Sequence, residues 1–67
     1  MDIEQRKKVI ADKLIDMGET LNSWASKNDL HLRIVNDLID GRLKGNRGVP
    51  LENRRKMEIT FGQIFDD

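Results

Sequence analysis

The 67 residues of the chain are enough for one domain with a small core, because a chain of this size buries only about 60% of its unfolded surface. The absence of cysteine excludes disulfides and thiolate metal sites, and no apolar segment approaches the roughly 20 residues of a membrane span. The formal net charge is +0 at pH 7, and the charged N-terminus lacks the apolar stretch of a signal peptide. We therefore expect a cytoplasmic domain that is not membrane-bound.

The first predicted helix ends at Met17. Ile3, Ile10, Leu14 and Met17 recur at spacings of seven, four and three residues, which places them on one face of a helix. Gly18 follows directly, in a position where a left-handed residue commonly ends a helix. We therefore predict that this face is buried and that a tight joint leads into a second helix.

The second helix is predicted at about residues 21–27. Thr20 precedes it as a side-chain cap, and its apolar stripe consists of Leu21, Trp24 and Ala25. Aromatic side chains can stack on nucleic-acid bases. The spacing of Trp24 from the other apolar residues favours a position in the core instead.

A third helix is predicted at about residues 32–40, shortly after the second. Asn28-Asp29 suits the tight turn between them, because both residue types tolerate left-handed backbone and form local hydrogen bonds. Leu30 is predicted to point inward from the turn, and Gly41 ends the helix. The predicted buried side of this helix consists of Ile34, Val35, Leu38 and Ile39.

A glycine-rich basic loop at residues 42–49 follows the third helix, with a short hairpin as the weaker alternative. Pro50 suits the first turn of a fourth helix, and Gly62 ends it. The apolar residues of this helix are Leu51, Met57 and Phe61. Ile64 and Phe65 are predicted to fold back as a final turn that closes the core. With no convincing strand, the predicted fold class is all-α.

The zero net charge conceals an uneven distribution along the chain. Residues 1–30 contain five basic and six acidic residues, whereas residues 31–56 contain seven basic and three acidic residues, a net charge of +4. The last eleven residues have a net charge of −3. A local basic patch on a neutral protein is compatible with a polyanion as a partner.

Two short helices joined by a tight turn are typical of a helix-turn-helix. Residues 18–41 resemble the helix-turn-helix of lambda-repressor/Cro-type phage and bacterial regulators, and the chain is also similar to small Ner-type phage regulators. The matching positions are the small residue at the helix crossing, the buried residue after the turn and the apolar pair that seats the second helix: Ala25, Leu30, Val35 and Leu38. The family usually has glycine in the turn, where this chain has Asp29.

The resemblance implies a compact lambda-repressor-like DNA-binding domain of four to five helices, a single domain over residues 1–67 with its helix-turn-helix at about residues 20–41. The third helix is the expected reading helix in the major groove. Base contacts are predicted from its front face: Leu32, Arg33, Asn36 and Asp37. Phosphate contacts are predicted from its start and from the basic loop: His31, Arg42, Lys44 and Arg47.

Each of these assignments has a simpler alternative. The polar residues could form a solvated helix face and an ordinary surface loop, and Leu32 could pack against the body of the protein or a dimer partner. His31, the only histidine, lacks the further ligands that a metal site needs. Lys7, Lys8 and the basic residues 54–56 are predicted to be solvated, with the alternative that one arginine of the second group assists the nearby basic loop. Nothing orients a nucleophile next to a base, and we do not expect an enzyme.

The sequence therefore predicts sequence-specific binding of double-stranded DNA by a phage- or prophage-type transcriptional regulator that occupies an operator in the bacterial nucleoid. The alternatives are a small phage accessory or antitoxin-like protein-interaction module, and an architectural or excision factor that binds DNA. Family members usually bind two half-sites as dimers. We expect a monomer or weak homodimer that pairs mainly on DNA, with Ile64 and Phe65 as an alternative dimer contact. No cofactor and no metal are expected.

Overall fold

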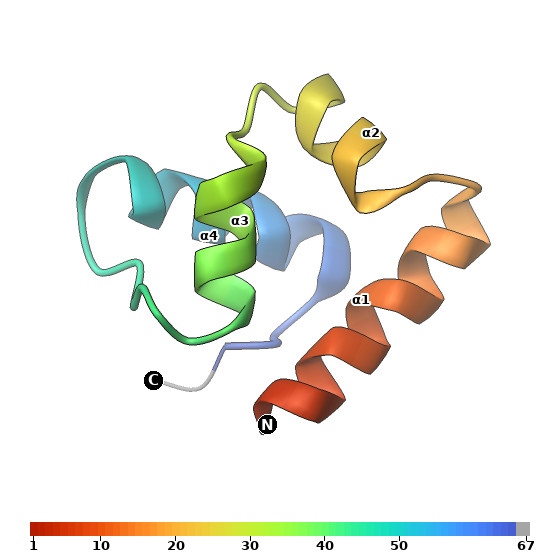
Figure 1. Cartoon of the computed structure of the whole chain (residues 1–67), viewed down its shortest axis with the longest axis horizontal. Helices are drawn as coiled ribbons and strands as arrows, with labels where there is room; N and C mark the ends of the chain where they lie inside the picture. The colour runs from red at the N-terminus through yellow and green to blue at the C-terminus, as the bar shows by residue number, and fades with distance from the viewer. Residues whose placement is uncertain (66–67) are drawn as a thin grey trace.

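Four helices form the regular structure of the chain, and Figure 1 shows their arrangement. The computed structural model describes residues 1–65. The helices are α1 (Ile3–Met17), α2 (Leu21–Lys27), α3 (Leu32–Ile39) and α4 (Gly48–Phe61). Because residues 1–65 contain no strand, the predicted all-α class is confirmed and the alternative hairpin in the basic loop is wrong. In this part of the chain, no helix has the length and apolar character needed to cross a membrane.

Local hydrogen bonds fix the ends of α1 and α2. At the start of α1, the Asp2 carboxylate accepts a hydrogen bond from the backbone N–H of Gln5 at 2.8 Å. Gly18 ends α1 in the left-handed conformation, with φ of 69°, as predicted. The Thr20 hydroxyl then accepts from the backbone N–H of Ser23 at 3.1 Å, which confirms it as the cap of α2. These bonds satisfy backbone groups that a helix end leaves unpaired.

The turn between α2 and α3 is built on left-handed backbone at Asp29, with φ of 56°. Aspartate adopts this conformation at a modest cost, so the residue replaces the glycine that such a turn favours. The backbone N–H of Leu30 then donates to the carbonyl of Ala25 at 2.9 Å, and the Leu30 side chain is buried. The Asn28 side chain donates to the carbonyl of Trp24 at 2.8 Å. The predicted turn and the inward leucine are confirmed.

The core lies between the four helices and the C-terminal segment, which returns from the end of α4 to cover it (Figure 1). The centre of the Trp24 ring lies 4.8 Å from that of Phe61, so α2 and α4 meet through a tilted aromatic pair. The buried apolar residues among those described are Ile10, Leu14, Trp24, Ala25, Leu30, Val35, Leu38, Ile39, Met57, Phe61, Ile64 and Phe65. The prediction that the last two close the core is confirmed.

Five apolar residues are less buried than their spacing predicts. Ile3 and Met17 are exposed, because they are the first and last residues of α1 and extend past the elements that cover its middle. Leu21, Ile34 and Leu51 are half-buried, and the first two pack against the edge of the core. Helical periodicity assigns a residue to one face of the helix. The neighbouring elements decide how much of that face they cover.

Two arginines lie against this core, and both donate hydrogen bonds to backbone carbonyls outside their own helix. The guanidinium of Arg6 donates to the carbonyls of Ile64 at 2.9 Å, Leu38 at 3.2 Å and Ile39 at 2.9 Å. It therefore joins α1 to the end of α3 and to the C-terminal segment. Arg54, predicted to be solvated, is only 7% exposed and donates to the carbonyl of Lys44 at 3.2 Å. That prediction is wrong, because Arg54 lies on the buried side of α4.

Replacement of Gly45 by alanine is expected to destabilise the protein more than the same change at Gly18. Both glycines are left-handed, with φ of +70° and +69°, a conformation that costs other residues about 1–2 kcal/mol. A Cβ atom on Gly45 would lie 3.0 Å from Leu38 Cδ2 and 3.1 Å from Arg54 Cδ, whereas one on Gly18 would meet nothing within 4 Å. Urea titration should therefore show an additional loss of about 1–2 kcal/mol for Gly45→Ala. Equal losses would mean that the loop moves away from α3 without cost.

Candidate nucleic-acid interface

The side of α3 opposite the core is open to solvent. Val35, Leu38 and Ile39 are buried, whereas Arg33 and Asn36 are exposed on the other side of the helix. Within residues 1–65, neither exposed side chain has a hydrogen bond or an ion pair. Arg33 and Asn36 therefore form an outer face of α3 whose donors and acceptors are available to a ligand. Arginine can donate twice to guanine, and asparagine can pair with adenine, in the major groove.

The two other predicted contacts at the start of α3 have different surroundings. Leu32 is half-buried and packs against the core, which favours the alternative that this side chain supports the body of the protein. His31 is exposed in the N-cap position of α3, and its side chain does not cap the helix. An exposed histidine at a helix N-terminus is suitably placed for a phosphate, because the first N–H groups of the helix also attract anions.

The two acidic residues at the C-terminal end of α3, one within the helix and one at its C-cap, each have a basic partner. A carboxylate of Asp37 lies 3.6 Å from the guanidinium of Arg42, and a carboxylate of Asp40 lies 3.3 Å from the ammonium of Lys7. These pairs reduce the repulsion that two carboxylates would exert on a polyanion next to Arg33 and Asn36. The first pair involves a predicted base contact and a predicted phosphate contact. It holds Arg42 beside the outer face of α3.

The basic loop starts at a fixed position relative to α3. The backbone N–H groups of Arg42 and Leu43 donate to the carbonyl of Asp37 at 2.8 and 3.2 Å. Lys44 and Arg47 are exposed, and neither side chain forms an ion pair within residues 1–65. The loop therefore supplies two unpaired cations whose charges are available to an anionic partner, Arg47 being the residue directly before α4.

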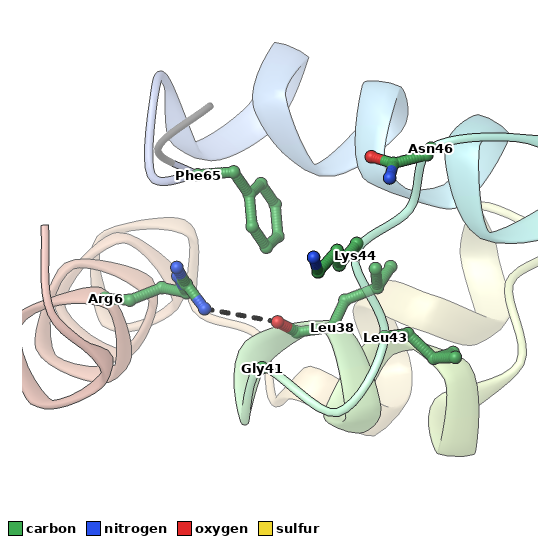
Figure 2. Close-up of a pocket in the computed structure, with 7 residues that line it drawn as sticks. All are labelled: Arg6, Leu38, Gly41, Leu43, Lys44, Asn46 and Phe65. Carbon is green, nitrogen blue, oxygen red and sulfur yellow. Dashed lines mark hydrogen bonds between the residues drawn. The ribbon is translucent and has the colours of Figure 1, made fainter.

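A pocket of about 560 Å³ lies between the loop, α1 and the C-terminal segment (Figure 2). Figure 2 shows the Lys44 side chain extending from the loop towards Arg6 and Phe65. The guanidinium carbon of Arg6 lies 4.8 Å from the centre of the Phe65 ring, a favourable cation–π distance. Residues that line the pocket are Arg6, Leu38, Gly41, Leu43, Lys44, Asn46 and Phe65. Positive charge thus continues from the loop to α1.

Arg6 and Arg54 are the residues of this region that sequence reasoning did not identify. Arg6 precedes Ile10 and Leu14 by four and eight residues, and Arg54 precedes Met57 and Phe61 by three and seven. Both arginines therefore share a helix face with buried residues. This spacing was the signal available in the sequence, although it does not specify which carbonyls the arginines bind.

Comparison with known proteins found no matching family model, curated protein or solved structure. Within the part of the chain that the structure describes, no group of three or more histidine and carboxylate side chains is placed to hold a metal ion. The arrangement of the site is therefore the basis for its assignment: an open helix face with hydrogen-bonding side chains, adjoining a loop with unpaired cations.

Proposed function

We propose that this protein binds double-stranded DNA sequence-specifically, with α3 as the reading helix in the major groove. In this proposal α2, the turn at Asp29 and α3 form a helix-turn-helix of the lambda-repressor type. Arg33 and Asn36 contact base edges, and Lys44 and Arg47 contact phosphates. The protein acts as a small transcriptional regulator of phage or prophage type that controls access to an operator by occupying it.

The observation that carries this proposal is the pairing of Asp37 with Arg42 at 3.6 Å. It turns the beginning of the basic loop, which directly follows α3 in the chain, back beside the outer face of that helix. Base edges and phosphates are adjacent in DNA, and a protein that reads sequence needs both kinds of contact on one surface. The unpaired side chains of Arg33 and Asn36 are suited to the first kind, and the loop cations to the second.

Arg33→Ala and Asn36→Ala are expected to weaken binding to the best operator, obtained by selection from a random DNA pool. Each change should cost roughly 1–3 kcal/mol, the range for a good base contact. Binding to random duplex DNA should change little, because base edges contribute little there. Fluorescence anisotropy with operator and random duplexes measures both effects. Unchanged operator affinity in both variants would exclude α3 as the reading helix.

In the same titrations, Lys44→Ala and Arg47→Ala should weaken operator and random binding about equally. Each variant should also reduce the slope of log affinity against log salt by about 0.9, the share of one phosphate contact. Lys13→Ala is the matched control, because Lys13 is exposed on α1, away from the basic loop in sequence, and should leave the slope unchanged. If wild type shows no binding to any duplex at low salt, the protein-interaction alternative replaces DNA binding.

A further inference from the structure

The outer side of α4 carries two exposed apolar residues, Val49 and Ile59, of which the second is 85% exposed. Glu52 and Lys56 lie between them and are also exposed. The spacings along Val49, Glu52, Lys56 and Ile59 are three, four and three residues, which places all four on one stripe of a helix. We refer to these four residues as the α4 stripe. It leaves apolar surface in water that no other residue among 1–65 covers.

The α4 stripe is complementary to itself when two copies run antiparallel. A two-fold axis midway between Glu52 and Lys56 sets Val49 of one copy opposite Ile59 of the other, and Glu52 opposite Lys56. Within one chain the two charged residues do not pair, although they are four residues apart on one helix. The ammonium of Lys56 donates to the carbonyl of Asn28 at 3.0 Å, and Glu52 has no ion pair within residues 1–65.

We propose that the α4 stripe is the contact surface of a homodimer, with a second copy of this chain as its partner. Two apolar pairs lie at the ends of this contact and two ion pairs at its centre. Stable interfaces bury about 1,200–2,000 Å² of total surface, and the contact between two single helix faces falls at or below the lower end. The dimer is therefore weak and forms at high protein concentration.

In this dimer, the outer face of α3 in one copy and the outer face of α3 in the other lie on opposite sides of the dimer. The inner side of α4, with Met57 and Phe61, packs towards α3, which lies in front of α4 in Figure 1. The α4 stripe consequently faces away from Arg33 and Asn36. Two such faces cannot read neighbouring half-sites of one duplex, and the dimer instead holds two duplexes together. This consequence rests on the proposed function, whereas the dimer contact does not.

Sedimentation equilibrium over a range of protein concentrations tests the contact without DNA. Wild type should self-associate, and Ile59→Lys should lower the association constant by at least about tenfold, because each dimer buries two copies of this residue. Glu52→Lys and Lys56→Glu should each weaken association, because each places like charges opposite one another. The variant with both changes restores opposite charges and should recover most of the wild-type association constant.

Ile15→Lys is the matched control, because Ile15 is 75% exposed but lies on α1. It should self-associate as wild type does. If wild type is monomeric at the highest concentration, the proposed dimer is wrong. It is also wrong if Ile59→Lys leaves the association constant unchanged, or if Ile15→Lys lowers it as much as Ile59→Lys does. Failure of the double charge exchange to recover association overturns the antiparallel register.

Capture of a labelled duplex by a second, immobilised duplex tests the bridging consequence. Wild-type protein should join the two, and Ile59→Lys should lose bridging while its affinity for a single duplex stays unchanged. If the protein binds a single duplex and self-associates but does not bridge two duplexes, the two α3 faces do not lie on opposite sides of the dimer. Absence of any DNA binding would instead contradict the proposed function and leave the sedimentation result intact.

Discussion

Replacement of Trp24 by alanine is expected to leave the protein largely unfolded. Trp24 is 3% exposed and packs on Phe61, so the change removes the largest side chain of the core and one half of its aromatic pair. Removal of a buried large aromatic costs about 3–5 kcal/mol. The total stability of so small a domain is on the order of 5 kcal/mol. Circular dichroism at 25 °C should therefore show a strongly reduced helix signal and no cooperative melting.

Two further variants separate the loss of packing from other effects. Trp24→Phe keeps an aromatic ring beside Phe61 and should fold with a lower melting temperature than wild type. Ile59→Ala also removes a large apolar side chain, but from an exposed position, and should change the free energy of unfolding by less than about 0.5 kcal/mol. Near-native melting of Trp24→Ala would contradict the assignment of this residue to the core.

Replacement of Arg6 by alanine is expected to destabilise the protein by about 2–4 kcal/mol, because one hydrogen bond from a charged group contributes about 1.5–3 kcal/mol. Arg6 forms three such bonds, to the carbonyls of Leu38, Ile39 and Ile64. Two of these carbonyls belong to the last turn of α3, so amide hydrogen exchange should accelerate there before it does in α2. Urea titration gives the total loss of stability.

Lys7→Ala provides the comparison for this prediction. Lys7 is adjacent in sequence and pairs with Asp40 at 3.3 Å, but its side chain is half exposed. An exposed pair of this kind contributes about 0–1 kcal/mol, so its loss should have a small effect. Arg6→Lys retains the charge but not the planar group that reaches three carbonyls, and its stability should lie between wild type and Arg6→Ala. A cost for Arg6→Ala as small as that of Lys7→Ala would mean that water replaces the guanidinium.

The candidate interface was predictable in part. The exposure of Arg33 and Asn36 followed from the apolar spacing of α3. When one side of a helix is buried, the residues that lie between the apolar positions in sequence face the solvent. The half-buried state of Leu32 was left open between two alternatives, since its angular position lies at the boundary of the two sides. The pairing of Asp37 with Arg42 was not predictable, because it depends on the path that the loop takes after Gly41.

The sequence by itself determined the all-α class, the C-terminal end of α1, the extent of α2 and the turn at Asp29. These features depend on interactions within about four residues: capping by Thr20, and left-handed backbone at Gly18 and Asp29. Such interactions connect neighbours in the chain, so a local pattern contains the information that they require.

Only the tertiary structure decided which charged residues are buried and which apolar residues are exposed. Arg6 contacts carbonyls that lie 32 to 58 residues away, and Arg54 is buried beneath the basic loop. Ile59 shares α4 with Arg54 and is nevertheless exposed, because no other described element covers that side of the helix. Burial depends on what packs against a face, and that follows from the arrangement of all the helices. For this reason local periodicity predicted the faces of the helices but not which of them the fold would cover.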